Sequence, residues 1–231
     1  MRLMALSTAV AEAALCLHDG EQVLASWHGP PRSGPGPVLG AARDLLDDAG
    51  IDFKDLDGLA FGRGPGAFTG VRLGVALAQG LHLGARVPLV PVSDLAALAW
   101  QGFRTHGWSR IMACLDARQG ELYWGGFDCT DAGTEKLTEE CIGVPEMLED
   151  FVGESWAWAG SGVSFLRSLP EGAASDPGLI PAVETVAELG VMDLSAGRTA
   201  GLSAAMPHYL RNRVAEPSPR YRRRRRSSQP E

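Results

Sequence analysis

Hydrophobic and polar positions alternate in two separate parts of the chain, near its start and again from about residue 110. Alternation with a period of two predicts strands that bury one face. The predicted strands cover residues 3–8, 13–18, 22–27, 57–61, 87–92, 111–116, 121–128, 136–142 and 156–159. Asp19-Gly20 separates the second strand from the third and is typical of a tight hairpin turn.

Apolar residues recur at helical spacing between these strands, and they predict helices over residues 38–49, 67–83, 93–104, 145–151 and 183–194. Each half of the chain therefore opens with hairpin-forming strands and continues with helices and further strands. This order predicts an α/β fold made of two similarly built halves. We expect an N-terminal subdomain over residues 1–107, a smaller second subdomain over 108–210 and a basic tail over 211–231.

The helix over residues 67–83 carries an unusual number of small residues. Gly66, Gly70 and Gly74 follow one another at four-residue spacing, although each glycine inside a helix costs about 1 kcal/mol relative to alanine. A sequence that accepts this cost repeatedly indicates that another group comes very close to the backbone. That group is a phosphate, the protein's own sheet or another protein.

A phosphate site is the weakest of these three interpretations. Backbone N–H groups at a helix N-terminus attract anions, but no Gly-Lys-Ser or Gly-Lys-Thr ends the loop, and Thr69 stands where a dinucleotide fingerprint has Gly or Ala. Close packing on a sheet or on a partner protein is favoured instead. Arg63 and Arg72 flank the glycine-rich turn and are candidates to contact an anion or a partner's carboxylate.

Composition places the chain among ordinary globular proteins, with 45% hydrophobic and 21% charged residues. We expect no transmembrane helix, because no apolar run approaches about 18 residues. The first residues begin a strand rather than a signal peptide. The four cysteines include no Cys-x-x-Cys pair and predict free thiols in a reducing cytoplasm, which is therefore the expected location.

The net charge of −7 conceals an uneven distribution. Residues 211–231 hold eight arginines and two glutamates, a local charge of +6, which leaves −13 on residues 1–210. The tail has little to bury and is expected to be disordered. It either contacts nucleic-acid phosphates or is a solvated terminal tail that folds back on the acidic body. The candidate nucleic-acid contacts are Arg222, Arg223, Arg224, Arg225 and Arg226.

Other motifs give little support for catalysis. The five histidines lack metal-ligand spacing, so no metal site is predicted. Gly160-Ser161-Gly162 lacks the pattern of a nucleophile elbow and predicts a strand-to-helix turn. Asp116, Arg118 and Glu121 cluster at a predicted hairpin turn and form either a binding site or a salt-bridged turn.

Two stretches, residues 62–74 and 88–98, resemble the signature of the TsaB (YeaZ) family. Residues 56–60, 116–124 and 207–215 agree with it in the right order. The resemblance implies the actin-like ATPase fold, with two ribonuclease-H-like subdomains and mixed sheets. It also implies a role in forming N6-threonylcarbamoyladenosine at position 37 of ANN-decoding tRNAs. In that family TsaB is the non-catalytic partner of TsaD, and their assembly recruits the ATPase TsaE.

The resemblance further implies that the helices over 38–49 and 67–83 build the interface with TsaD, or with a second copy when the chain is alone. The interface candidates are Val38, Ala42, Leu45, Leu46, Gly66, Ala67, Gly70, Val71, Gly74 and Ala78. No intrinsic cofactor is expected, and ATP or ADP is expected only at the interface of the complex. Candidate nucleotide or partner contacts are Arg63, Arg72, Asp116, Arg118 and Glu121.

One departure from the family favours a scaffold over an enzyme. Ser7-Thr8 stands where the first strand of the family ends in Asp-Thr, so a metal-coordinating carboxylate is missing. Two alternatives stay open. The first is an actin-fold peptidase or kinase-like enzyme that acts alone, and the second is a stand-alone tRNA-binding protein that uses residues 211–226.

Overall fold

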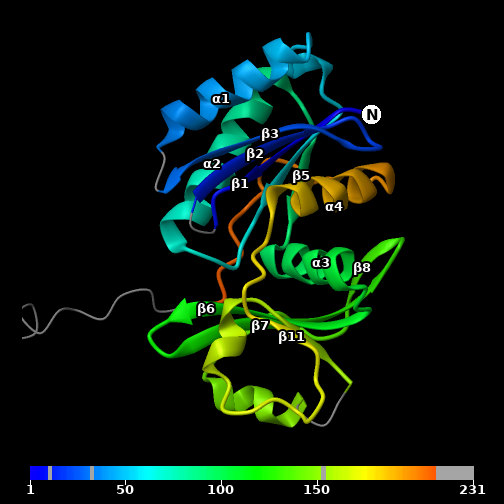
Figure 1. Ribbon diagram of the computed structural model, residues 1–231. Coiled ribbons are helices and arrows are strands. Elements are labelled where there is room, and N and C mark those ends of the chain that lie inside the picture. The colour runs from blue at the N-terminus through cyan, green and yellow to red at the C-terminus, as the bar shows by residue number, and fades with distance from the viewer. Residues whose placement is uncertain (10–11, 32–33, 152–154, 212–231) are drawn as a thin grey trace, which may run out of the picture.

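The computed structural model describes residues 1–9, 12–31, 34–151 and 155–211, which form two mixed sheets with helices around and between them (Figure 1). Sheet 1 has the order β3-β2-β1-β4-β5. Its strands are β1 (Leu3–Ser7), β2 (Glu12–His18), β3 (Val23–Pro31), β4 (Gly58–Gly62) and β5 (Leu89–Val92).

Sheet 2 repeats the topology of sheet 1. Its order is β11-β10-β6-β7-β8, and β9 also pairs with β7. Its strands are β6 (Arg110–Arg118), β7 (Glu121–Thr130), β8 (Gly133–Lys136), β9 (Cys141–Gly143), β10 (Ala157–Ala159) and β11 (Ser175–Asp176). In each sheet three antiparallel strands are followed by two parallel ones. The predicted duplicated α/β fold is confirmed.

Strand alternation directs the side chains of sheet 1 into two separate cores. Met4 and Leu6 of β1 pack with helices α1 (Pro35–Asp48) and α2 (Phe68–Ala85), whereas Leu3 and Ala5 face helix α4 (Val183–Ser195). Sheet 1 is therefore covered by helices on both faces (Figure 1). A short 3₁₀ helix, η1 (Phe53–Asp55), precedes β4.

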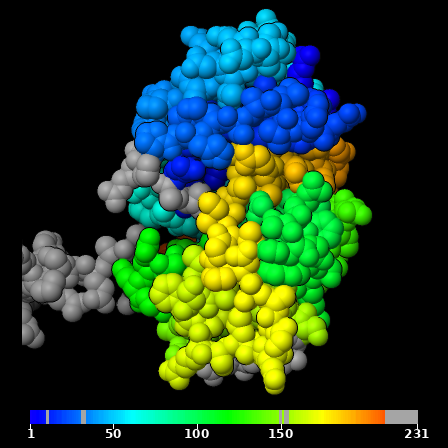
Figure 2. Space-filling view, in the orientation of Figure 1, coloured from blue at the N-terminus to red at the C-terminus, as the bar shows by residue number. Residues whose placement is uncertain are grey.

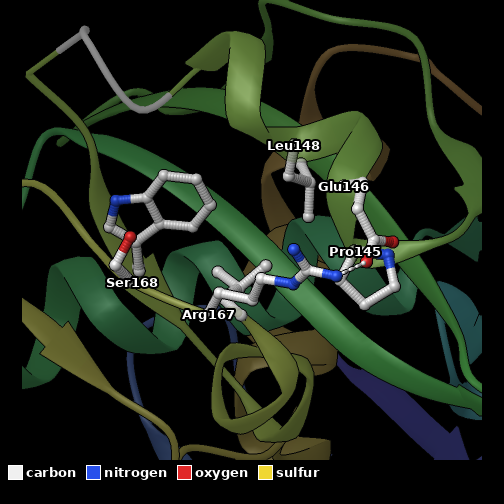
Figure 3. A pocket seen from close by; sticks show the side chains of 7 residues that line it. Pro145, Glu146, Leu148, Arg167 and Ser168 are labelled. Carbon is white, nitrogen blue, oxygen red and sulfur yellow. Dashed lines mark hydrogen bonds and ion pairs between the residues drawn. The ribbon is translucent and has the colours of Figure 1, made fainter.

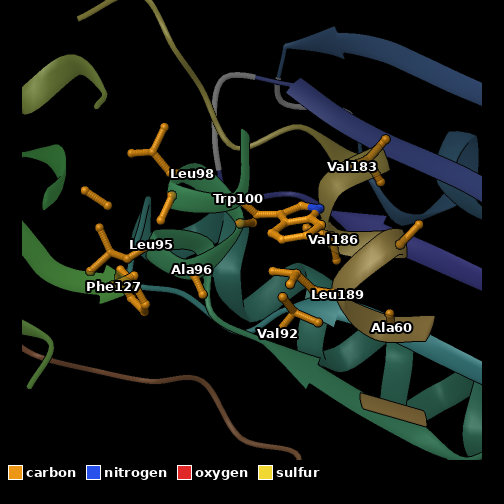
Figure 4. Close-up of a cluster of buried hydrophobic side chains, with 14 of the residues drawn as sticks. Ala60, Val92, Leu95, Ala96, Leu98, Trp100, Phe127, Val183, Val186 and Leu189 are labelled. Carbon is orange, nitrogen blue, oxygen red and sulfur yellow. The ribbon is translucent and has the colours of Figure 1, made fainter. Parts of the chain in front are cut away.

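The middle layer of the molecule joins its two halves. Helix α3 (Asp94–His106) covers sheet 2, α4 covers sheet 1, and the two helices share one hydrophobic cluster (Figure 4). Trp100 of α3 lies in this cluster and donates from Nε1 to Glu188 Oε2 of α4 at 2.5 Å. In the space-filling view α4 lies between the N-terminal strands and the second half (Figure 2). The predicted division after residue 107 thus separates the strands of the two sheets but not the helices that cover them.

The outer face of sheet 2 has a thinner covering than that of sheet 1. Two 3₁₀ helices, η2 (Pro145–Phe151) and η3 (Ser161–Phe165), contribute Leu148 and Val163 to the cluster on this face. The turn predicted at Gly160 is confirmed, because η3 begins directly after β10. The predicted strand 136–142 is wrong in its middle, where the N–H groups of Leu137 and Thr138 both donate to the Gly126 carbonyl and the chain turns.

The C-terminal segment (residues 199–211) returns from α4 to sheet 1 and then crosses to sheet 2. The Ala200 N–H donates to the Leu89 carbonyl at 2.8 Å, and the Ala205 carbonyl accepts from Gln79 Nε2 at 2.9 Å. Further along, the His208 N–H donates to the Arg63 carbonyl at 2.8 Å. The course of this segment is not predictable from the sequence pattern, since residues 199–211 form no helix or named strand.

The cysteines have free thiols, and Cys16, Cys114 and Cys129 are buried. Burial raises the pKa of Cys16 and of Cys129 to about 12, so these thiols stay protonated and inert. Within the described ranges, no helix joins enough length to enough apolar character to cross a bilayer.

Candidate functional site

Five polar residues meet where the two halves of the molecule touch, and we call them the inter-lobe cluster. Arg63 follows β4, Ser93 and Asp94 begin α3, Glu140 precedes β9, and His208 lies on the C-terminal segment. Of these five residues, only Arg63 is among the contact residues expected from the sequence. The helix expected over residues 93–104 begins at Ser93 and Asp94. Ser93 does cap α3, since its Oγ accepts from the Ala96 N–H at 3.2 Å.

Glu140 is the centre of the inter-lobe cluster, and its side chain is only 4% exposed. Its Oε2 lies 2.7 Å from His208 Nδ1 and 3.5 Å from Arg63 Nη2, and its Oε1 accepts a hydrogen bond from Ser93 Oγ. A buried carboxylate needs such partners. Glu140 therefore joins its own segment to three others, through His208, Arg63 and Ser93.

Asp94 lies fully buried beside this carboxylate. Its Oδ2 accepts from the Gly64 N–H at 2.6 Å, whereas its Oδ1 is buried without a hydrogen-bond partner among the described residues. Burial, with a smaller contribution from Glu140, raises the pKa of Asp94 to about 7 against the opposing effects of the Gly64 N–H and Arg63. Through its hydrogen bond from the Gly64 N–H, Asp94 fixes the glycine-rich turn that leads into α2.

The glycine-rich turn and α2 pack against the end of β1. A Cβ on Gly66 would lie 2.8 Å from the Ala9 carbonyl oxygen, and one on Gly74 would lie 2.5 Å from Thr8 Oγ1. At Gly70 it would overlap the Thr8 carbonyl oxygen. Carbonyl oxygens repel anions, so this face is no phosphate cradle. Of the three interpretations open in the sequence, the structure shows contact with the protein's own sheet.

Arg72 does not face these glycines, but lies in an exposed stack with two aromatic rings, Phe68 and Tyr209. Its Cζ lies 3.7 Å from the centroid of the Phe68 ring, and its Nε donates to Tyr209 Oη at 2.6 Å. The two ring centroids are 5.6 Å apart. We call these three residues the Arg72 stack. Its two rings come from segments 141 positions apart and were not predicted to meet.

The hairpin tip between β6 and β7 brings together the three charged residues expected there. Asp116 Oδ2 pairs with Arg118 Nη1 at 3.0 Å, and Glu121 Oε2 pairs with Arg211 Nη2 at 2.6 Å. Arg211 also donates to Gln119 Oε1 at 2.8 Å. Both carboxylates are therefore occupied, whereas the Arg118 side chain is 85% exposed.

Ser7 ends β1 where a catalytic member of an actin-like fold would need a carboxylate. Its side chain is buried, and its Oγ has no hydrogen-bond partner in the described part of the chain. Across the described ranges, no group of three histidine, cysteine or acidic side chains is placed to hold a metal ion. The residues Arg222 to Arg226 proposed to contact tRNA lie outside the described residues.

Comparison with known proteins agrees with this architecture. The chain is 34% identical over 227 residues to the tRNA threonylcarbamoyladenosine biosynthesis protein TsaB of Escherichia coli K12, which covers 93% of this chain and 96% of that protein. The chain belongs to the TsaB family. A solved structure described as YeaZ from Pseudomonas aeruginosa superposes with a TM-score of 0.82 at 34% identity, covering 90% of this chain and 99% of that one.

A TsaD-type match accompanies the TsaB-family likeness. The family model described as "TsaD: tRNA N6-adenosine threonylcarbamoyltransferase" matches residues 38–169. A tRNA N6-adenosine threonylcarbamoyltransferase of Cereibacter sphaeroides is 50% identical over 54 residues, which are 23% of this chain and 15% of that protein. The predicted actin-like, ribonuclease-H-like fold is thereby confirmed.

The TsaB-family interface predicted from sequence needs revision in its residues. Most of the ten candidates lie inside this chain's own core, which leaves them little surface for a partner. The buried members are Val38, Ala42, Leu46, Val71, Gly74 and Ala78. Leu45, Gly66 and Gly70 are half-buried, and Ala67 is exposed.

Other residues form the free faces of the same two helices. A period of 3.6 turns one face of each helix to sheet 1 and leaves the other outside. Beyond the first residues of each helix, the exposed residues are Leu39, Gly40, Arg43, Asp44, Asp47 and Asp48 on α1, and Thr69, Arg72, Ala76, Gly80, Leu83 and Gly84 on α2. A Cβ added at Gly40 or Gly80 would meet nothing within 4 Å. We call these residues the outer face of α1 and α2.

A cavity of about 340 Å³ opens on the outer side of sheet 2 (Figure 3). Leu148, Trp158 and Leu166 supply its apolar lining, and Arg167 lies at its side. The Arg167 guanidinium pairs with Glu146 at 3.1 Å, so its charge is already met. The two charged side chains of the lining therefore neutralise each other.

Proposed function

We propose that this protein is the non-catalytic scaffold subunit of the complex that forms N6-threonylcarbamoyladenosine at position 37 of ANN-decoding tRNAs. In this role it pairs with a TsaD-type subunit and recruits TsaE, and any ATP or ADP is bound at the interface of the complex. Support comes from membership of the TsaB family and from the name of its E. coli relative. Without a TsaD-type subunit, the chain pairs with a second copy of itself.

The proposal that this protein is non-catalytic rests on what fills the space between its two halves. A nucleotide-binding relative of this fold needs an open polar cleft there, with a carboxylate beside the phosphates. Here the shared hydrophobic cluster of α3 and α4 occupies the middle, and beside it the side chains of Arg63 and His208 both pair with Glu140. At the end of β1 the chain has Ser7, a hydroxyl side chain, and not that carboxylate.

The outer face of α1 and α2 supports the pairing part of the proposal. Leu83 is 66% exposed and Leu39 is 41% exposed, so each of the two helices offers an apolar side chain that a partner would cover. Gly40 and Gly80 have open space beside them on the same two helices, where a partner's side chains would fit. Apolar residues with small residues between them allow two helices to pack closely, with about 8–10 Å between their axes.

The test mixes the purified full chain with its cognate TsaD-type subunit and measures mass by light scattering after size exclusion. We expect a 1:1 complex that displaces the self-associated form. Gly80→Trp is expected to abolish this complex because an indole on the outer face holds the two helix pairs apart. Gly80→Ala, at the same position, is the matched control and should leave the complex intact.

Two results would contradict the proposal. If Gly80→Trp, with an unchanged melting temperature, still forms the complex, the outer face is not the interface. If the chain alone hydrolyses ATP or a peptide at a substantial rate, the alternative of an actin-fold peptidase or kinase-like enzyme replaces the scaffold. Reconstituted transfer to tRNA that needs both chains, with no turnover by this chain alone, supports it.

A further inference from the structure

The cavity on the outer side of sheet 2 takes its apolar lining from three separate elements. Trp158 comes from β10 of the sheet, Leu148 from η2, and Leu166 from the segment that follows η3. Leu148 and Trp158 are buried, so the core on this face holds these walls in place. The volume of about 340 Å³ lies at the lower end of the range of small-molecule sites. The cavity therefore suits a small ligand that is mostly apolar.

One buried polar group of this lining has no partner. The Trp158 side chain is 0% exposed, and its Nε1 lacks a hydrogen-bond partner among the described residues. Buried indole N–H groups usually have one, as Trp100 does on Glu188. The chain's own polar groups therefore do not complete the surroundings of Trp158, which sets this wall apart from the packed core around Trp100.

The two charged side chains of the lining form an exposed ion pair. Arg167 and Glu146 extend toward each other from different elements (Figure 3), with Nη2 and Oε1 at 3.1 Å. The Arg167 side chain is 78% exposed and that of Glu146 is 48% exposed. Pairs this exposed contribute little stability, because water solvates both charges and salt screens them. Another carboxylate can therefore replace Glu146 on the guanidinium with little loss.

The chemistry beside the apolar wall favours a carboxylate as the polar end of the ligand. Leu166, Arg167 and Ser168 follow one another in the lining and supply an apolar side chain, a guanidinium and a hydroxyl. A guanidinium can bind both oxygens of a carboxylate, and a hydroxyl can donate a further hydrogen bond. A ligand ammonium would instead have Glu146 as its only charged partner in this lining, and a phosphate with two charges would be repelled by it.

We propose that this cavity binds a small molecule that joins an apolar body to one carboxylate. The apolar body lies against Leu148, Trp158 and Leu166, and the carboxylate replaces Glu146 on Arg167. Such a site goes beyond the scaffold role, which assigns no ligand to the second half of the chain. The full chain alone is sufficient for the test, so the result does not depend on pairing with a TsaD-type subunit.

The experiment titrates the isotope-labelled full chain with hydrocinnamate and follows the assigned indole N–H signal of Trp158 by NMR. We expect this signal to shift with ligand concentration and to reach saturation, because the ring lines the cavity. Hydrocinnamyl alcohol has the same apolar body without the carboxylate, and it should bind about tenfold more weakly.

Two variants beside the cavity should act in opposite directions. Arg167→Gln removes the guanidinium and should weaken hydrocinnamate binding about tenfold, with the alcohol unaffected. Glu146→Gln removes the competing carboxylate and should strengthen hydrocinnamate binding several-fold. Arg198→Gln is the matched control and should change neither affinity, since Arg198 is also an exposed arginine in an ion pair, with Asp193 at 2.7 Å.

Three results would overturn the proposal. The first is a Trp158 signal that hydrocinnamate does not shift. The second is equal affinity for the acid and the alcohol, which would remove the role of the guanidinium. The third is a loss of binding that Arg167→Gln and Glu146→Gln share, because both variants would then have disturbed the walls rather than the charges. Melting temperatures equal to that of the parent show that each variant is folded.

Discussion

Helix α2 carries glycines on two faces, and they have different physical causes. Gly70 and Gly74 press against the backbone and side chain of Thr8, where no Cβ fits. Gly80 and Gly84 lie further along the helix and have nothing within 4 Å of an added Cβ. The first pair serves this chain's own fold, and the second leaves an outer face open. A glycine-rich helix can therefore combine a structural requirement with a binding surface.

The largest expected effect comes from breaking the inner contact. Gly70→Ala places a methyl group on the Thr8 carbonyl oxygen, and backbone on both sides prevents an easy adjustment. We expect the free energy of unfolding to fall by about 4–5 kcal/mol, which rivals the whole stability of many domains. Urea unfolding followed by circular dichroism measures this loss.

Gly84→Ala is the control for that experiment, because it adds the same methyl group to open space on the same helix. It should be neutral or slightly stabilising. If Gly70→Ala unfolds no more easily than Gly84→Ala, the two faces of α2 do not differ in the way that the contact with Thr8 implies.

The stability of the protein should also depend on pH, through Asp94, which holds the turn that leads into α2. Burial raises the pKa of Asp94 from 3.8 to about 7, while the unfolded chain keeps the lower value. Between about pH 4 and pH 7 the folded protein therefore binds a proton that the unfolded chain releases, and stability falls as the pH rises through this window. Each pKa unit represents 1.36 kcal/mol, which limits the effect to about 4 kcal/mol.

Asp94→Asn isolates this effect, since the amide stays neutral and its oxygen can still accept from the Gly64 N–H. We expect the variant to match the parent near pH 4 and to become progressively more stable than the parent up to about pH 7, with no further gain above. Thermal unfolding at several pH values measures the difference. A constant difference across this range would show that Asp94 does not titrate in the folded protein.

Much of this fold follows from local sequence signals. Period-two and helical patterns, with turn residues between them, predict the strand pairs, the Asp19-Gly20 hairpin and the four long helices. The doubling of the topology follows from their order. The break between β8 and β9 does not, because it depends on two N–H groups that share one distant carbonyl, that of Gly126.

The site was harder to predict than the fold. Helix α2 has apolar or small residues on almost every side, so its sequence cannot show which face turns to sheet 1; the ten interface candidates therefore fell mostly on the buried face. The inter-lobe cluster joins Arg63, Glu140 and His208, which are far apart in the chain. The Arg72 stack likewise requires Tyr209 to return to α2. Such contacts arise from tertiary packing, and no short sequence motif predicts them.

A smaller effect on stability is expected from the hydrogen bond on the side of α2 that packs against Thr8. Thr8 Oγ1 donates to the Gly70 carbonyl at 2.7 Å, and this bond ties α2 to the end of β1. Thr8→Val keeps the shape but removes the donor, and it should cost about 1 kcal/mol of unfolding free energy. Thr8→Ser keeps the hydroxyl and should cost less. Equal losses in both variants would assign the effect to packing rather than to the hydrogen bond.

The smallest expected effect has the opposite sign and lies on the outer face. Gly80→Ala removes backbone freedom from the unfolded chain and meets no neighbour in the folded one. We therefore expect the free energy of unfolding to rise by up to about 1 kcal/mol, the intrinsic difference between the two residues inside a helix. Urea unfolding of the monomeric fraction measures it, with Gly70→Ala in the same series. A fall in stability at Gly80 would mean that α2 already packs against something on its outer face, and would remove the contrast between its two sets of glycines.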